Sequence, residues 1–320
     1  MTRYFAFNGD ADGLCALQQL RLACPGDATL VTGVKRDILL LDRIDAGPRD
    51  TVTALDISLE QNRGGLLRLL AAGARVDYFD HHHAGELPAH RGLCAHIDEG
   101  ADVCTSILVD RHLGGRHRNW AITAAFGDNL AGVARLMAAQ AGLHARDITV
   151  LEQLGTCLNY NAYGECVADL HFDPAELAAH MLPFADPLDF AAQCAAYRVL
   201  CAGYADDMAQ ARCLAPSHEV PGAALLVLPD AAWARRAIGV LANELVSGRP
   251  GDAIGLLSPR TDGGFAVSVR VPAHSATGAA DFCRGFDTGG GRRLAGGINH
   301  LPDADVERFT RSFTDCFGRA

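Results

Sequence analysis

Four aspartates stand at or just after the ends of short apolar runs, and these aspartates are Asp10, Asp12, Asp56 and Asp80. Apolar runs of this length predict β-strands, and the carboxyl ends of parallel strands line one edge of a sheet. We therefore expect the four carboxylates to lie close together. Carboxylates crowded in this way repel one another and raise one another's pKa unless cations neutralise them. The pattern predicts a cation site at this edge.

A histidine run adds nitrogen donors at the same place, because His81, His82 and His83 directly follow Asp80. A site rich in carboxylate oxygens with one or two imidazoles suits Mn²⁺ or Mg²⁺ better than a zinc ion held by thiolates. The 11 cysteines offer no alternative site, since none forms the Cys-x-x-Cys spacing of a zinc knuckle. We expect them to be reduced thiols.

Two simpler interpretations compete with a metal site. Each aspartate could merely cap the helix that follows its strand, and this would explain any one of them. All four together, beside a histidine run, favour the metal site. The Asp-x-Asp-Gly stretch at residues 10–13 also resembles the start of a calcium loop, but the fifth and twelfth positions of such a loop are here Leu14 and Arg21. The calcium interpretation is therefore excluded.

The elements that would position these residues predict an α/β protein. Within residues 1–130, short apolar runs alternate with helical stretches, which favours a parallel sheet wrapped by helices. The expected strands are residues 4–7, 30–32, 51–55, 76–79 and 94–97. The expected helices between them are residues 13–23 and 59–72. Residues 118–212 read as mostly helical, with a break at 182–187.

A second α/β pattern begins near residue 222. It predicts strands at 224–228, 253–257 and 265–270 and a helix at 231–246, with a hairpin turn at Asp262-Gly263-Gly264. We therefore expect a parallel-sheet metal-binding domain over residues 1–186, a helical linker over 187–221 and a smaller α/β substrate-binding domain over 222–320.

Composition excludes several classes of protein. The 320 residues are 49% hydrophobic and 21% charged, as in a globular protein, and no window approaches 18 uninterrupted apolar residues. Without an apolar signal core at its start, the chain is expected to be cytoplasmic and to have no membrane partner. Only one of the 28 basic residues is a lysine, Lys35, and the net charge is −10. Such a chain is a poor non-specific binder of long duplex nucleic acid.

The C-terminal part holds a locally basic, glycine-rich segment. Gly289, Gly290 and Gly291 precede Arg292 and Arg293. Backbone N–H groups of a glycine loop can approach an anion closely, so the segment is a candidate phosphate-binding loop. The simpler alternative is a tight turn beside surface arginines.

Five motifs in this order resemble a known family. Asn8-Gly-Asp-Ala-Asp-Gly13, the single Asp56, Asp80-His81-His82 and Gly127-Asp128-Asn129 resemble the four motifs of the DHH phosphoesterases. The segment from Gly289 to Gly297 resembles the glycine-rich signature of the DHHA1 domain that follows in that family. The resemblance extends from the first motif to about residue 301.

The resemblance implies a binuclear hydrolase that cuts phosphoester or phosphoanhydride bonds with two Mn²⁺ ions per chain, Mg²⁺ or Co²⁺ being alternatives. The implied metal ligands are Asp10, Asp12, Asp56, His81 and Asp128. Asp10 would bind one ion, and the other ion would be bound by Asp12, His81 and Asp128. Asp56 would bridge the two ions. Two such ions can share a nucleophile and neutralise the transition-state oxygens.

Further roles follow from the same resemblance. His82 would face the scissile phosphate with Asp80 beside it, and these two are the catalytic candidates. The substrate-binding candidates are Gly289, Gly290, Gly291 and Arg292 of the glycine-rich segment, with His300, and Arg270 is added because it ends a predicted strand.

The chain also departs from the family pattern. Many small-substrate members carry a histidine where this chain has Ala6, and the nearest polar side chain is Asn8. Arg292 stands where the DHHA1 signature usually has histidine, and His300 is the residue that could replace it. An arginine there would grip phosphate but could not carry a proton near neutral pH.

These observations predict a metal-dependent phosphoesterase for small nucleotides or short oligonucleotides. An aromatic content of 7%, with no visible platform for stacking bases, argues against a processive nuclease. A single-strand exonuclease and a polyphosphate or pyrophosphate hydrolase remain alternatives because of Ala6. A non-catalytic nucleotide sensor, motivated by Ala6 and Arg292, is the alternative of another class. The expected partner is a small anionic nucleotide, and a homodimer remains open.

Overall fold

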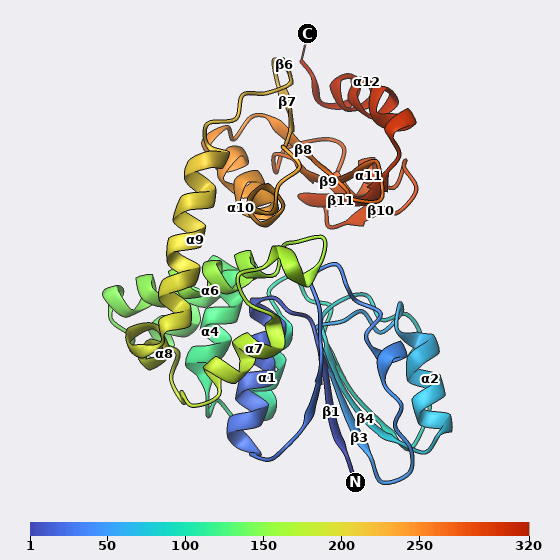
Figure 1. Cartoon of the computed structure of the whole chain (residues 1–320), viewed down its shortest axis with the longest axis vertical. Helices are drawn as coiled ribbons and strands as arrows, with labels where there is room; N and C mark the ends of the chain where they lie inside the picture. Colours follow the sequence, from blue (N-terminus) through green and yellow to red (C-terminus); the bar gives the residue numbers. More distant parts are fainter. Residues whose placement is uncertain (320) are drawn as a thin grey trace. The chain divides into compact units, whose positions relative to one another are not determined.

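The computed structural model describes residues 1–319 and shows two compact units (Figure 1). The first comprises residues 1–162 and 166–202, and the second comprises residues 163–165 and the chain from Gly203 onward. The boundary falls inside a helix, α9 (Ala195–Ala211). Among the described residues, no helix combines the length and the apolar character needed to cross a bilayer.

The first unit is built on a five-stranded parallel sheet with the order β2-β1-β3-β4-β5. Its strands are β1 (Arg3–Phe7), β2 (Thr29–Val31), β3 (Thr51–Leu55), β4 (Arg75–Asp80) and β5 (Leu93–Ile97). The expected α/β class with a parallel N-terminal sheet is confirmed. The strands β1 and β3 are neighbours, but the chain passes from β1 to β2 on one side and from β3 to β4 on the other. In open sheets of this kind, ligands bind at the carboxyl ends of such a strand pair.

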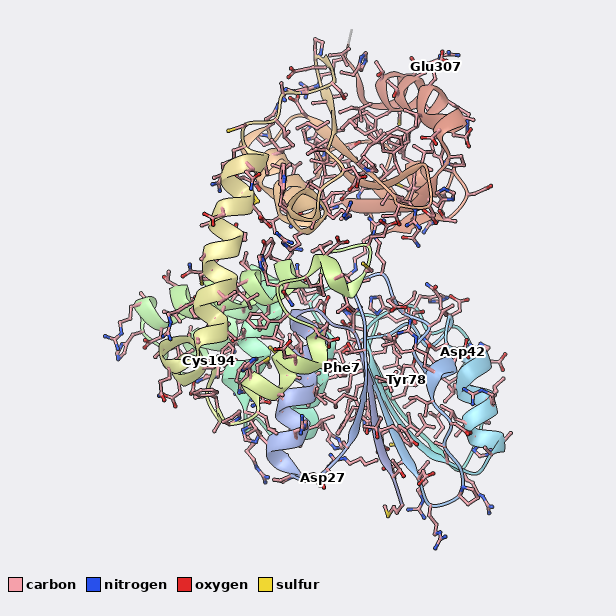
Figure 2. The ribbon with its side chains drawn as sticks, in the orientation of Figure 1. Phe7, Asp27, Asp42, Tyr78, Cys194 and Glu307 are labelled. Carbon is pink, nitrogen blue, oxygen red and sulfur yellow. The ribbon has the colours of Figure 1, made fainter. Side chains whose placement is uncertain are left out.

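Helices cover both faces of this sheet. Between β1 and β2 the chain forms α1 (Ala11–Ala23), and between β3 and β4 it forms α2 (Arg63–Ala71), on the opposite face (Figure 1). Apolar side chains fill the space between α2 and the sheet, with Tyr78 among them (Figure 2). The α2 helix begins later than expected because residues 59–62 form a turn before it.

The rest of the first unit is helical, as the sequence predicts for residues 118–212. Its helices are α3 (Thr105–His112), α4 (Arg118–Gly127), α5 (Ala131–Gln140), α6 (Ala145–Asn161), α7 (Pro174–Met181) and α8 (Pro187–Gln193). Asp173 and Asp186 cap α7 and α8, and a proline occupies the first helical position of each. The expected break at 182–187 separates these two helices.

The second unit contains a six-stranded mixed sheet with the order β10-β11-β9-β8-β7-β6. Its strands are β6 (His218–Val220), β7 (Ala223–Val227), β8 (Ala253–Pro259), β9 (Phe265–Arg270), β10 (Gly289–Gly291) and β11 (Ala295–Leu301). Its remaining helices are α10 (Ala232–Gly248), α11 (Ala279–Cys283) and α12 (Val306–Phe317). The glycine segment 289–291 differs from the expected loop. It is an edge strand whose backbone pairs with β11.

Close packing of α1, α4 and α6 in the first unit determines the position of Asp128, the residue that follows α4. A Cβ atom added at Gly127 would lie 2.4 Å from Ala11 Cβ and 2.9 Å from Gly155 O. A Cβ atom at Gly155 would lie 2.2 Å from Thr123 O. Only glycine allows α1, α4 and α6 to approach so closely. The contact places Asp128, which follows α4, beside the first turn of α1.

We predict that Gly127→Ala lowers the free energy of unfolding by about 1–3 kcal/mol, because the added methyl group overpacks this contact. Gly132→Ala in α5 is the matched control, since no atom lies within 4 Å of its Cβ position. The control should be neutral or stabilising by up to about 1 kcal/mol. Urea denaturation measures both variants. A Gly127→Ala protein as stable as the parent would contradict the packing account.

Candidate metal centre

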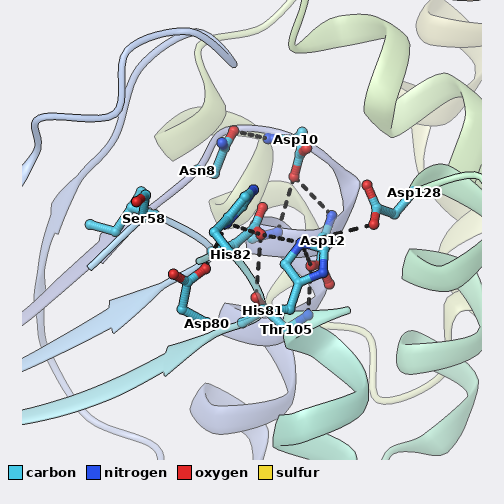
Figure 3. Close-up of polar contacts among 12 residues, drawn as sticks. Asn8, Asp10, Asp12, Ser58, Asp80, His81, His82, Thr105 and Asp128 are labelled. Atoms are coloured by element: carbon cyan, nitrogen blue, oxygen red, sulfur yellow. Dashed lines mark hydrogen bonds and ion pairs between the residues drawn. The ribbon is translucent and has the colours of Figure 1, made fainter. Parts of the chain in front are cut away.

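The carboxyl edge of the parallel sheet gathers acidic side chains from several segments. Asp56 follows β3, Asp80 ends β4, and Asp10 lies in the short turn between β1 and α1. Asp12 is in the first turn of α1, and Asp128 directly follows α4. Figure 3 shows Asp10, Asp12, Asp80 and Asp128 gathered in one region with His81 and His82. The sequence could place the strand-end aspartates at one edge, but the approach of α4 depends on helix packing.

The imidazole of His81 is the point on which three carboxylates converge. Its Nε2 atom lies 3.4 Å from Asp56 Oδ1, 3.9 Å from Asp12 Oδ2 and 3.9 Å from Asp128 Oδ2. The Asp12 and Asp56 side chains are almost fully buried, and that of Asp128 is 16% exposed. Donor atoms of Asp56, His81 and His82 also lie within 4.8 Å of one another. A single ion could reach several of these groups.

The backbone determines which nitrogen of His81 faces the carboxylates. His81 Nδ1 lies 2.8 Å from the carbonyl oxygen of Val103. A carbonyl oxygen can only accept, so Nδ1 carries a proton and donates it. Nε2 is thereby directed at the acidic cluster. Metal-binding histidines are held in this way, with the outer N–H on a carbonyl or carboxylate and the other nitrogen toward the ion.

The charges at this edge are unbalanced. Burial raises the pKa of Asp12, and burial together with the charges of Asp12 and Asp10 raises that of Asp56 well above its usual range. Burial alone would lower the pKa of His81, but the neighbouring carboxylates, Asp56 first among them, raise it to about 10. A divalent cation would neutralise this cluster. Three carboxylates and one imidazole form a donor set that suits Mn²⁺ or Mg²⁺.

The backbone at Asp56 adopts a left-handed conformation, with φ of 58°. Aspartate and asparagine tolerate this region better than most residues, and such conformations cluster at functional sites. The Thr105 hydroxyl donates to Asp56 Oδ1 over 3.2 Å and helps to fix the carboxylate.

The N-terminus of α3 holds Asp12. The backbone N–H of Thr105 donates to Asp12 Oδ2 and that of Ser106 to Asp12 Oδ1, each over 2.7 Å. These are charge-assisted bonds at the positive end of a helix dipole. This role of residues 105 and 106 could not be predicted from the sequence, because it depends on backbone atoms rather than on residue type.

Asp80 and His82 form a pair beside the cluster. Asp80 is fully buried, its Oδ1 lies 2.7 Å from His82 Nδ1, and its Oδ2 accepts the Leu59 N–H over 3.3 Å. The His82 side chain is 40% exposed. Asp80 thus orients His82, whose Nε2 is the ring nitrogen left to meet a ligand. His83 is exposed and pairs instead with Glu99.

Asp10 faces Lys35, a residue that the sequence motifs do not assign to the site. Asp10 Oδ1 accepts the N–H groups of Asp12 (3.0 Å) and Gly13 (3.2 Å), so Asp10 also caps α1. Its Oδ2 forms an ion pair with Lys35 Nζ. Burial raises the pKa of Asp10, but the Lys35 ammonium outweighs it and brings the value to about 2. The signal available in the sequence was that the chain has a single lysine.

The substrate-binding candidates all lie in the second unit. The Arg270 guanidinium donates to Asn243 Oδ1 (2.7 Å), Ser268 Oγ (3.0 Å) and Val269 O (3.1 Å). Gly289, Gly290 and Gly291 form β10, and Arg292 is exposed at the turn between β10 and β11.

His300 is not brought to Arg292. Its Nε2–H donates to Gly263 O over 3.1 Å, in the turn between β8 and β9. It lies near the other end of β11 from Arg292, about 16 Å along the strand at roughly 3.3 Å per residue. The structure therefore places His300 away from the position where it would replace a histidine at residue 292.

Comparison with solved structures shows the fold. Exonuclease RecJ bound to manganese aligns with a TM-score of 0.65 and 16% identity, over 98% of this chain and 89% of that one. RecJ from Thermus thermophilus in complex with Mn²⁺ aligns with a TM-score of 0.67 and 18% identity, over 98% of this chain and 51% of that one. CDC45 from Entamoeba histolytica aligns with a TM-score of 0.55 and 8% identity, over 99% of this chain and 95% of that one.

No family model and no curated protein matches the sequence. The chain spans about half of the Thermus protein. At these identities the alignments establish a shared RecJ-like two-domain fold, and the resemblance to the DHH/DHHA1 phosphoesterases is confirmed at that level.

We predict that Mn²⁺ binding at neutral pH releases at least one proton per ion, because His81 must lose its Nε2 proton to become a ligand and Asp56, whose pKa is also raised, must be ionised. The pKa of His81 without metal is about 10, so the imidazole is charged at pH 7. Mn²⁺ affinity should therefore rise as the pH increases toward that value and fall as the pH decreases. Calorimetric titrations in two buffers of different ionisation enthalpy measure the proton count. Identical heats in both buffers would contradict this assignment of His81.

Proposed function

We propose that the chain is a metal-dependent phosphoester hydrolase with its centre at the carboxyl edge of the parallel sheet. The observation that carries the proposal is the convergence of Asp12, Asp56 and Asp128 on His81 Nε2. These residues come from four separate segments, and several of them are buried with like charges facing one another. Mn²⁺ is the proposed ion, since the two RecJ structures of the same fold are manganese complexes.

The bound ion and the residues of the centre have different roles in the proposed reaction. When bound, the divalent ion supplies positive charge to the phosphate oxygens and makes water more acidic. His81 presents Nε2 to the ion because Val103 holds its Nδ1 proton. The N-terminus of α3 keeps Asp12 in place. Phosphoryl transfer depends mainly on such positioning and charge stabilisation, so no nucleophilic side chain is required.

His82 is the proposed group for proton transfer. Asp80 holds its Nδ1, and its partly exposed ring can bring Nε2 to a substrate. From there Nε2 can donate a proton to the leaving oxygen or contact the scissile phosphate.

Of the two ions expected from the family resemblance, the proposed hydrolase retains the one at Asp12, Asp56, His81 and Asp128. The position at Asp10 differs because Lys35 is paired with its carboxylate.

The proposed substrates are small nucleotides or short oligonucleotides. The net charge of −10 disfavours association with a long polyanion. Arg270, Arg292 and the backbone of β10 are the proposed substrate-binding groups. A second candidate is a single-strand exonuclease, which is favoured by the fold shared with the exonuclease RecJ.

We predict that Asp56→Asn reduces Mn²⁺-dependent hydrolysis by about three orders of magnitude or more, because several kcal/mol of charge stabilisation depend on the ion. Asparagine tolerates the left-handed backbone at this position, so the fold should persist. In metal-free buffer, the thermal midpoint should be unchanged or higher, since the substitution removes one of the repelling carboxylates.

Asp77→Asn is the matched control, because Asp77 is an exposed aspartate within β4. It should leave both activity and thermal midpoint unchanged. A sharp drop in the metal-free midpoint of Asp56→Asn would show that Asp56 has a structural role instead. Full activity of that variant would remove Asp56 from the centre.

Substrate length separates the two candidate functions. We expect release of mononucleotide from a dinucleotide with Mn²⁺ at a higher kcat/KM than from a long single strand. Both rates are measured with the same purified chain and free Mn²⁺ concentration. The reverse order would favour the exonuclease, and no turnover of either substrate with Mn²⁺ or Co²⁺ would count against a hydrolase.

A further inference from the structure

Lys35 is the sole lysine among the 28 basic residues of the chain, and it lies at the metal centre. Its ammonium pairs with Asp10 Oδ2 and donates to Asn159 Oδ1 over 3.1 Å. The side chain of Lys35 is 26% exposed, whereas that of Asp10 is only 4% exposed. The pair therefore stands at the border between the buried cluster and solvent. Lys35 places a compact ammonium point charge here, whereas every other residue among these 28 carries a planar guanidinium.

The backbone around Lys35 is fixed from two sides. Its N–H donates to Ala162 O over 2.9 Å, at the C-terminal end of α6. Its carbonyl oxygen accepts from Asn8 Nδ2 over 3.3 Å. A Cβ atom at Gly9 would lie 2.2 Å from Gly33 O, so the two segments approach closely. The ammonium itself donates to Asn159 Oδ1, a side chain from the last turn of α6, whose C-terminal end favours a cation.

The Asp10 side of the centre offers a second metal ion few ligands. One Asp10 oxygen caps α1 and the other is paired with Lys35. Ala6 packs in the apolar cluster under α2. Asn8 Oδ1 accepts the Asp10 N–H over 3.3 Å, and its amide nitrogen donates to Lys35 O. Asp10 also hydrogen-bonds to Asp56. The imidazole of His81 is directed at Asp12, Asp56 and Asp128.

We propose that the Lys35 ammonium is the second cation of this centre, so that the chain binds one divalent ion beside a fixed lysine charge. The proposal rests on the hydrolase function argued above. The ion lies with Asp12, Asp56, Asp128 and His81, and Lys35 neutralises Asp10. As the partly exposed cation of the pair, Lys35 also supplies positive charge to a phosphate oxygen of the substrate. A lysine serves as such a point charge in many phosphate sites.

Metal stoichiometry tests this directly. We expect one Mn²⁺ per chain in the wild type after equilibrium dialysis against excess MnCl₂, with the six-line electron paramagnetic resonance spectrum of an isolated ion. Lys35→Ala and the isosteric Lys35→Met free Asp10, so they should bind two ions and give the broadened spectrum of a coupled pair. Arg43→Ala is the matched control, because it removes the Arg43–Asp37 ion pair on the same segment and should leave the count at one.

The outcomes separate the two proposals. Two ions in the wild type would overturn the role of Lys35 and leave the hydrolase proposal intact. One ion in both the wild type and the Lys35 variants would also overturn it, since Lys35 would not be what excludes the second ion. No bound ion in the wild type would overturn the hydrolase proposal itself.

A second measurement uses the unmodified chain and does not depend on how the variants fold. Mass spectrometry after acylation with an amine-specific ester reports on Lys35 alone among side chains. We expect saturating Mn²⁺ to leave the acylation rate of Lys35 unchanged, because the ion binds without displacing the ammonium. Asp10→Asn should raise the rate by about tenfold, the factor for loss of one charge-assisted bond worth roughly 1.4 kcal/mol. A tenfold rise caused by Mn²⁺ in the wild type would show displacement and contradict the proposal.

Discussion

Mutual repulsion among buried carboxylates is the constraint on which the organisation of the first unit depends. Asp10, Asp12 and Asp56 are almost fully buried at one edge of the sheet, and burial, followed by the charges of neighbouring carboxylates, raises the pKa of Asp12 and Asp56. Two cationic side chains oppose this repulsion from different sides. His81 serves Asp12, Asp56 and Asp128, and Lys35 serves Asp10. The centre therefore has two parts. In one part the carboxylates require a bound cation, and in the other the charge of Asp10 is already neutralised by Lys35.

The fold supplies the positions that this arrangement requires. Parallel pairing aligns the ends of β1, β3 and β4. The chain leaves the adjacent strands β1 and β3 in opposite directions, toward β2 and β4, and ligands bind at the carboxyl edge beside such a point. Backbone N–H groups at the N-terminus of α3 donate to Asp12. The close helix contact at Gly127 places Asp128 beside the first turn of α1. Residues that never touch the ion therefore determine which carboxylates can share it.

Local sequence patterns predict the parts of this structure that depend on local rules. The strands of the first unit, the strand-end aspartates and the α/β class follow from apolar periodicity and parallel pairing, whereas β6, β10 and β11 of the second unit are not among the expected strands. Asp128 is predicted only by the family resemblance, because helix packing places it. The role of Lys35 escapes prediction, since its contacts with Asp10 and Asn159 span long stretches of sequence. The glycine segment 289–291 is expected as a loop but pairs as an edge strand, because its backbone finds a partner in β11.

The most direct test of the centre is anomalous diffraction at the manganese edge from crystals soaked in MnCl₂. We expect one strong peak within bonding distance of His81 Nε2 and of carboxylate oxygens from Asp12, Asp56 and Asp128, with the Lys35–Asp10 ion pair still formed. Crystals in which manganese binds elsewhere, and in which this cluster shows no anomalous peak, would contradict the account.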